Sequence, residues 1–142
     1  MTPAQKKLVQ ASWGRVVPIA DAAAATFYGR LFLIDPTTRP LFRAADMARQ
    51  RKKLMDVIGM AVAGLDRLDA LVPTVEDLGR RHANYGVKDE HYDSVGAALL
   101  WTLEQGLGSA WNAETKAAWA EVYGLVSGAM RRAQREAMTV AA

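Results

Sequence analysis

Among the side chains of this sequence, His82 is the one whose position most strongly suggests chemistry. Leu71, Val75, Leu78 and His82 recur at helical spacing, so the imidazole shares a helix face with apolar side chains. An imidazole directed into an apolar interior is either a core histidine with its hydrogen bonds satisfied or a metal ligand. This helix alone leaves both interpretations open.

The sequence offers few other metal ligands. It contains two histidines and no cysteine, and we expect the second histidine, His91, to lie exposed beside Glu90 at the start of a helix. Zinc usually needs three or four protein ligands, whereas haem needs only an axial one because the porphyrin provides four nitrogens. A single inward histidine therefore favours haem among the metal options. No HExxH, EF-hand, GxSxG or phosphate-binding glycine loop indicates another chemistry.

The elements that must position His82 are predicted to be helices throughout. Apolar residues recur at helical spacing, and no segment shows the alternation of a strand. The predicted helices cover residues 3–17, 20–34, 37–42, 48–65, 73–86, 89–106 and 112 onward. In this scheme a loop through Leu71 leads to Pro73, which begins the His82 helix, and Gly86 ends it. We predict an all-α fold of seven to eight helices in a single domain, residues 1–142.

Composition and charge argue against several classes of partner. A net charge of +3, with basic and acidic residues interspersed, predicts a solvated surface rather than a nucleic-acid interface. The longest weakly polar run, Ala22–Phe27, is far too short to cross a bilayer. Lys6, Lys7 and Arg15 interrupt the N-terminal region, so we expect no signal peptide. The absence of cysteine is compatible with a reducing compartment. We therefore expect a cytoplasmic protein that binds neither nucleic acid nor membrane.

Several landmark residues occur in an order that resembles a known family. They are Phe27-Tyr28 with Leu31-Phe32, Pro40-Leu41-Phe42, Gln50 with Leu54, Leu71-Val72-Pro73 with His82, Tyr92 to Gly96, and Ala118-Trp119 through Tyr123-Gly124. Over nearly all of the chain, their order and spacing resemble globins, most closely bacterial single-domain haemoglobins and the globin domain of flavohaemoglobins. The resemblance implies a globin fold around a pocket for haem b (iron protoporphyrin IX). It also implies that His82 is the proximal iron ligand.

On the distal side, the resemblance assigns roles to three residues. Tyr28 and Gln50 match the distal pair of the bacterial group, and Leu54, one helical turn beyond Gln50, matches the leucine that closes over the ligand. Both members of the pair can donate a hydrogen bond. A bond to an oxygen ligand that has gained partial negative charge is worth about 1.5–3 kcal/mol. The pair thus predicts tight oxygen binding, unless Tyr28 is a structural core tyrosine.

Further residues match the apolar contacts of the haem in this family. Phe42 resembles the phenylalanine that stacks on the haem after the short third helix. The resemblance implies that the rest of the pocket is lined by Ile58, Val87, Val95 and Leu99. Taken singly, each of these side chains is equally typical of a plain hydrophobic core.

On the proximal side, the flavohaemoglobin pattern supports the ligand with a tyrosine and a glutamate. Tyr92, ten residues after His82, matches the tyrosine, and Glu136, thirteen residues after Tyr123, matches the glutamate. Such a network would give His82 imidazolate character and favour chemistry on oxygen. The alternative for Glu136 is a solvated charge near the C-terminus.

Two functions follow from the resemblance. The first is reversible oxygen binding, and the alternative is nitric oxide dioxygenation, that is, NO detoxification. Because the 142 residues contain no GxGxxG motif for flavin or nicotinamide domains, we expect turnover to need a separate flavin/NAD(P)H reductase. The expected ligands are O2, NO and other diatomic molecules, and both a monomer and a homodimer remain open.

Overall fold

The computed structural model describes residues 1–141, with side chains through Thr139, and every regular element among them is helical. Six α-helices follow one another along the chain: α1 Pro3–Val16, α2 Ala20–Ile34, α3 Met47–Ala63, α4 Leu68–Ala83, α5 Asp89–Leu107 and α6 Ala113–Ala141. Four short 3-10 helices lie at their junctions: η1 Val17–Ile19, η2 Pro36–Phe42, η3 Leu65–Arg67 and η4 Gly108–Ala110. The all-α prediction is confirmed.

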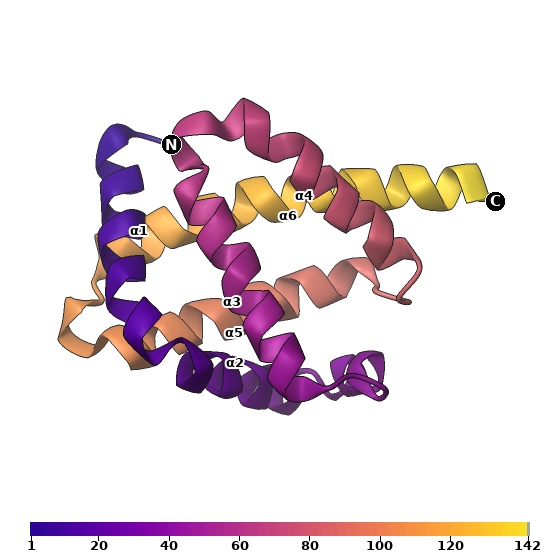
Figure 1. Cartoon of the computed structure of the whole chain (residues 1–142), viewed down its shortest axis with the longest axis horizontal. Coiled ribbons are helices and arrows are strands. Elements are labelled where there is room, and N and C mark those ends of the chain that lie inside the picture. The colour runs from indigo at the N-terminus through magenta and orange to yellow at the C-terminus, as the bar shows by residue number, and fades with distance from the viewer. Residues whose placement is uncertain (142) are drawn as a thin grey trace.

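In Figure 1, α2, α5 and α6 run nearly along the long axis of the molecule, whereas α1 and α3 run steeply across it. The most extensive packing joins α4 to α6, α2 to α5 and α1 to α6. In Figure 1, α3 runs across α5 in the foreground, and α6 extends behind α4 toward the C-terminus. This arrangement places α3 and α4, which carry Gln50 and His82, as separate elements over the α5–α6 layer.

Local sequence signals explain where several helices begin. The Thr2 hydroxyl accepts a hydrogen bond from the Gln5 backbone N–H, and the Gln5 side chain accepts one from the Thr2 N–H, which forms a capping box. The Asp46 carboxylate caps α3 through the backbone N–H groups of Ala48 and Arg49. The Asn112 side chain accepts from the Thr115 N–H, as predicted for the start of the last helix.

The helix that carries His82 begins earlier than predicted. Residues 68–71 are the first turn of α4 and not a loop, and Pro73 lies inside the helix rather than at its start. Pro73 lacks the N–H that would bond to the carbonyl four residues earlier. The helix persists because Leu71 and Val75, on either side of Pro73, are both buried. The helix also ends earlier than predicted, at Ala83 with Asn84 as its C-cap, and Gly86 lies three residues beyond it with a positive φ of 76°.

The core lies between α1, α2, α5 and α6. Its largest fully buried side chain is Trp119, whose indole N–H donates to the Ser12 hydroxyl at 2.8 Å. The Trp13 ring packs against Trp119 with the ring centroids 6.2 Å apart. A polar pair is stable in this position because the buried indole N–H is satisfied.

One stretch, Pro3–Ile34, is long and apolar enough by length and composition alone to span a membrane. It comprises α1, η1 and α2, with Pro18 in the 3-10 turn between the two helices. Val9, Val16, Phe27 and Leu31 from this stretch belong to the buried core cluster. Core packing accounts for these buried side chains, whereas 28% of the apolar window in this stretch is buried in the fold.

Candidate haem site

His82 is held in one tautomer by its own helix. Its Nδ1 lies 2.5 Å from the Leu78 carbonyl oxygen, one turn earlier in α4. A carbonyl oxygen can only accept, so Nδ1 carries the hydrogen and donates it. The Nε2 atom is then left with a lone pair, as a metal ligand requires. The side chain is only partly buried.

The position of His82 is fixed by a close crossing of α4 and α6. Gly79, three residues before His82, is buried against the Met130 backbone. A Cβ atom at this position would overlap the Met130 carbonyl oxygen. The absence of a side chain at Gly79 therefore lets the ligand helix approach α6 closely.

Tyr28 and Gln50 meet as the resemblance predicted. The Gln50 amide Nε2 donates to the Tyr28 hydroxyl at 3.2 Å, which joins α3 to α2. Because the Tyr28 oxygen is the acceptor in this bond, its own hydrogen stays free for another acceptor. Tyr28 is 5% exposed, and burial raises its pKa above the usual value of 10.0 despite the opposing hydrogen bond from Gln50. The phenol is therefore a neutral donor at physiological pH.

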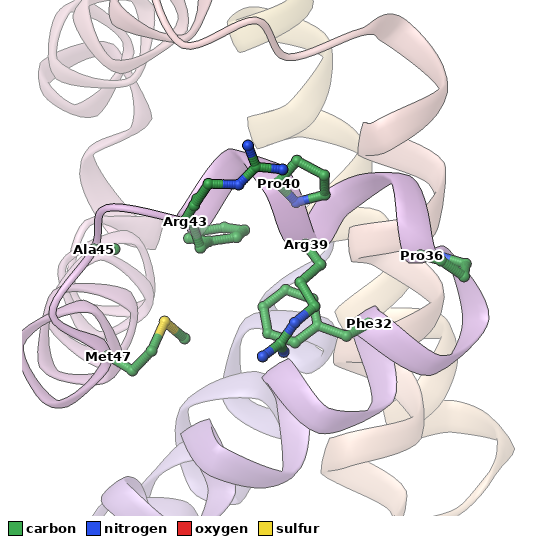
Figure 2. A pocket seen from close by; sticks show the side chains of 8 residues that line it. Phe32, Pro36, Arg39, Pro40, Arg43, Ala45 and Met47 are labelled. Atoms are coloured by element: carbon green, nitrogen blue, oxygen red, sulfur yellow. The ribbon is translucent and has the colours of Figure 1, made fainter.

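Phe42 stands beside this pair in an aromatic cluster. Its ring packs edge-on against Tyr28 at 5.3 Å and lies 5.7 Å from the Phe32 ring, centroid to centroid. A hollow of about 500 Å³ borders Phe42 between η2 and the start of α3. Figure 2 shows the side chains that line it. Arg39 lies across the Phe32 ring there, at 5.1 Å from its centroid, and Arg43 and Met47 face the same space. Phe42 thus contacts Tyr28 and also lines the open hollow.

The remaining predicted pocket residues come from α3, α5 and the connection between α4 and α5. Leu54, Ile58 and Val95 pack against the core cluster but stay partly exposed, as does Val87. Leu99 is buried within the cluster itself. Partly exposed apolar side chains beside a buried core are typical of residues that border a ligand space.

Between α5 and α6, beside His82, a tyrosine and an amide form a buried hydrogen-bonded chain. The Tyr92 ring centroid lies 6.1 Å from that of His82. The Tyr92 hydroxyl donates to Gln134 Oε1 at 2.5 Å, and Gln134 Nε2 donates to the Val87 carbonyl at 2.6 Å. Burial raises the pKa of Tyr92 to about 12, against a smaller lowering by the charge of Arg131. Tyr92 is therefore a neutral phenol beside the imidazole.

Arg131 packs over the ring of this tyrosine, a contact that was not predicted from the sequence. Its guanidinium lies 5.1 Å from the Tyr92 ring centroid. It is paired with Asp93 at 2.7 Å and with Asp89 at 3.5 Å. Both nearby carboxylates on α5 are thus engaged by this arginine.

The prediction that Glu136 supports Tyr92 is wrong, because a residue two positions earlier in the helix takes this place. Glu136 is exposed on α6, and the hydrogen-bond partner of Tyr92 is Gln134, which is 5% exposed. Residues two apart on an α-helix point about 200° away from each other, so an offset of two exchanges an inward position for an outward one. Gln134 was detectable in the sequence, because it lies four residues after Met130 and so continues the apolar stripe of the last helix.

The expectation that His91 is exposed is also wrong. His91 is 4% exposed, and its Nδ1 accepts a hydrogen bond from the Lys88 backbone N–H at the start of α5. Its Nε2 lies 3.0 Å from the Thr37 hydroxyl, which donates to the Asp35 carboxylate. The Ser94 hydroxyl donates to the other oxygen of Asp35. His91 is thus a structural histidine that caps α5 and connects it to the start of η2.

The donors present match haem better than a metal ion held by side chains alone. Among the described residues, no group of three His, Cys, Asp or Glu side chains could hold a metal ion. The site instead combines one imidazole with a free Nε2, an apolar surround and a hydrogen-bond donor on another helix. One axial nitrogen suffices only when four equatorial ligands arrive with the cofactor.

Comparison with known proteins decides the family. The family model for Globin matches residues 25–130, which include Tyr28, Gln50, His82 and Tyr92. The chain belongs to the globin family. As a globin, it is a haem protein, and the free Nε2 of His82 is the atom in the described site that suits the iron.

Individual relatives of this globin carry two different names, Flavohemoprotein and Neuroglobin. It is 32% identical over 111 residues to the Flavohemoprotein of Bacillus subtilis (strain 168), and the aligned segment covers 77% of this chain but 28% of that protein. It is 31% identical to the Neuroglobin of Tetraodon nigroviridis, covering 89% of this chain and 88% of that protein. The Neuroglobin of Chaenocephalus aceratus is 30% identical, covering 88% and 87%. This globin thus spans a minor part of the flavohaemoprotein and nearly all of each neuroglobin.

Proposed function

We propose that this globin binds haem b through His82 and reversibly binds oxygen with high affinity. The observation that carries the proposal is the Gln50–Tyr28 hydrogen bond, which leaves the phenol hydrogen of a buried tyrosine free. Haem, when bound, supplies a ferrous iron that can take a diatomic ligand. Tyr28 then donates to that ligand, and Gln50 keeps the phenol oriented.

The energy of this donor favours retention of the ligand. A hydrogen bond to a group with partial negative charge is worth about 1.5–3 kcal/mol, which corresponds to roughly a ten- to hundredfold slower release because 1.4 kcal/mol is tenfold. Tyr28 is already fixed by packing against Phe27 and Phe42, at 5.0 and 5.3 Å between ring centroids. Little ordering entropy is lost when it meets the ligand.

The first experiment tests the haem ligand. We expect the purified protein, supplied with haem, to show a Soret band that His82→Ala loses. Added imidazole should restore the band in this variant by occupying the space left by the side chain. A band that is unchanged in His82→Ala would show that another residue ligates the iron.

The second experiment tests the distal donor. Oxygen release, followed by stopped-flow displacement with carbon monoxide, should be roughly ten- to hundredfold faster in Tyr28→Phe. Tyr85→Phe is the matched control: Tyr85 is 59% exposed, and the change removes only its hydroxyl while keeping the ring that packs on His82, so the rate should stay as it is. Equal rates in the wild type and Tyr28→Phe would contradict the proposed role of Tyr28.

The second candidate function is nitric oxide dioxygenation with electrons from a separate reductase. It is favoured by the likeness to a protein named Flavohemoprotein and by the Tyr92 ring beside His82. The distinguishing measurement is sustained consumption of nitric oxide in the presence of a flavin reductase and NAD(P)H. Consumption that stops after one equivalent supports oxygen binding as the function, and continued turnover supports the enzyme.

A further inference from the structure

Gln134 is a buried amide whose orientation can be assigned from its neighbours. The Val87 carbonyl oxygen can only accept, so the group that faces it at 2.6 Å is the amide Nε2. The carbonyl end, Oε1, therefore faces the Tyr92 hydroxyl, which must donate its hydrogen. The phenol hydrogen of Tyr92 is directed toward Gln134 on α6.

The two groups held by Gln134 are the tyrosine beside the proposed axial histidine and the connection that follows the histidine's helix. Val87 belongs to the connection between α4, which carries His82, and α5, which carries Tyr92. The Tyr92 ring lies 6.1 Å from the His82 ring, centroid to centroid. A single side chain of α6 thus fixes both the connection and the tyrosine that borders the imidazole.

The hydrogen bonds on this side of the site end on neutral groups. Within residues 1–139, His82 Nδ1 donates to the Leu78 carbonyl, and Tyr92 donates to the amide of Gln134. Two acidic residues of α5, Asp89 and Asp93, are paired with Arg131, which packs on the Tyr92 ring. Tyr92 contacts His82 through its ring and not through one of these hydrogen bonds. A carboxylate in place of the Gln134 amide would therefore act on the histidine by placing a negative charge nearby.

We propose that Gln134 is a positioning residue: it holds Tyr92 beside His82 and places a neutral amide, where a carboxylate would add negative charge near the axial ligand. This inference rests on the proposed function, since it takes His82 to be the axial ligand. It deepens that function, because an axial imidazole without added negative charge suits reversible binding of oxygen. A more negatively charged ligand donates more electron density to the iron and promotes reaction of the bound oxygen. The identity of residue 134 then determines which of the two candidate functions this site supports.

Gln134→Glu tests this inference by adding a charge at almost constant size. The carboxylate can still accept from Tyr92, now in a charge-assisted bond. We expect the iron–histidine stretching frequency, measured by resonance Raman on the ferrous ligand-free protein, to rise, and the reduction potential to fall. Glu136→Gln is the control on the same helix, since residue 136 is exposed and its change should move neither value.

Two further variants separate charge from packing. Gln134→Met removes both hydrogen bonds at similar size without adding charge, so it should not raise the stretching frequency. Tyr92→Phe should leave the frequency unchanged, because a phenol that donates to an amide puts no negative charge on His82. Tyr92→Phe also decides the matter if Gln134→Glu does not fold.

The inference is overturned by an unchanged frequency in Gln134→Glu, by an equal rise in Gln134→Met, or by a clear fall in Tyr92→Phe. These outcomes differ from a failure of the proposed function. If His82 is not the ligand, the wild type itself gives no iron–histidine band. If oxygen is not retained through Tyr28, the frequencies behave as expected while the release rate in Tyr28→Phe stays unchanged.

Discussion

The direction of one hydrogen bond determines what Tyr28 can offer to a ligand. Gln50 donates to the phenol oxygen, so the phenol hydrogen has no competing acceptor within the pair. If the amide accepted instead, the same two residues at the same distance would leave the ligand without the tyrosine donor. The distal chemistry is therefore set by which atom donates as well as by which residues are present.

The raised pKa of Tyr28 predicts a flat pH profile for oxygen release. Burial favours the neutral phenol, so its pKa lies above 10.0 and the donor is intact at neutral and mildly alkaline pH. We expect the release rate to stay constant between about pH 7 and pH 10 and to rise only beyond the ordinary tyrosine pKa of about 10. In Tyr28→Phe the rate should be faster and should lack this alkaline rise. A rise in the wild type below pH 9 would contradict a buried neutral donor.

Residue roles could be predicted from the sequence where spacing within one helix decided them. His82 and its face follow from the period of α4, and the Tyr28–Gln50 contact follows from the family pattern. Glu136 and His91 were misplaced because their orientation depends on the register between distant helices. Local spacing cannot show that α6 presents Gln134 to Tyr92, or that His91 reaches back to Thr37.

At the scale of elements, the crossing of α4 and α6 limits the volume allowed at Gly79. In Gly79→Ala the new methyl group would overlap the Met130 carbonyl, so the helices must separate. We expect a loss of about 1–3 kcal/mol in the free energy of unfolding, as is typical of overpacking, measured by urea denaturation.

Gly124→Ala on α6 is the matched control for this crossing. Nothing lies within 4 Å of a Cβ atom at Gly124, and the residue is exposed. Alanine should stabilise this position by up to about 1 kcal/mol because it has the higher helix propensity. Equal stability of Gly79→Ala and the wild type would show that the two helices are not held at this spacing.

The junction between η2 and α5 predicts a specific loss of stability in acid. Hydrogen bonds from Ser94 and Thr37 lower the pKa of Asp35 below its usual 3.8. A depressed carboxyl pKa stabilises the folded state above the unfolded pKa, and this stabilisation disappears as the pH falls through the folded pKa. Asp35→Asn should therefore be less stable than the wild type at pH 7, and the difference should shrink below about pH 4.

Urea denaturation at several pH values measures this difference directly. Glu136→Gln serves as the control, because its exposed side chain should give a small difference at each pH. A difference between Asp35→Asn and the wild type that stayed constant down to pH 2 would assign the effect to packing instead of charge.

At the scale of the whole molecule, haem and folding are linked. The apolar residues that border the site belong to different elements, with Leu54 and Ile58 on α3 and Val95 on α5. A ligand that binds only the folded chain stabilises it by about 2.7 kcal/mol at a free concentration of 100 times its Kd. We expect removal of haem to lower the unfolding temperature, and the holo–apo difference, measured by calorimetry, to vanish in His82→Ala.

The global architecture could be predicted further than its details. Helical periodicity and turn residues predicted the all-α class, the starts of α2, α5 and α6, and the short helix that ends at Phe42. The start of α4 was missed because tertiary burial of Leu71 and Val75 outweighs the local effect of Pro73. The helix start that was mispredicted from local sequence is thus determined by packing between distant segments.

The Trp13–Trp119 pair in the core has an optical consequence. Indoles emit in the near ultraviolet, where haem absorbs strongly, and the chain has only four tryptophans. Trp119 is fully buried against Ser12, so its emission is shielded from solvent and depends mainly on energy transfer inside the fold. The empty protein should fluoresce and the loaded one should be dark, so the same pair that fills the core can report haem uptake and loss in real time without an added label.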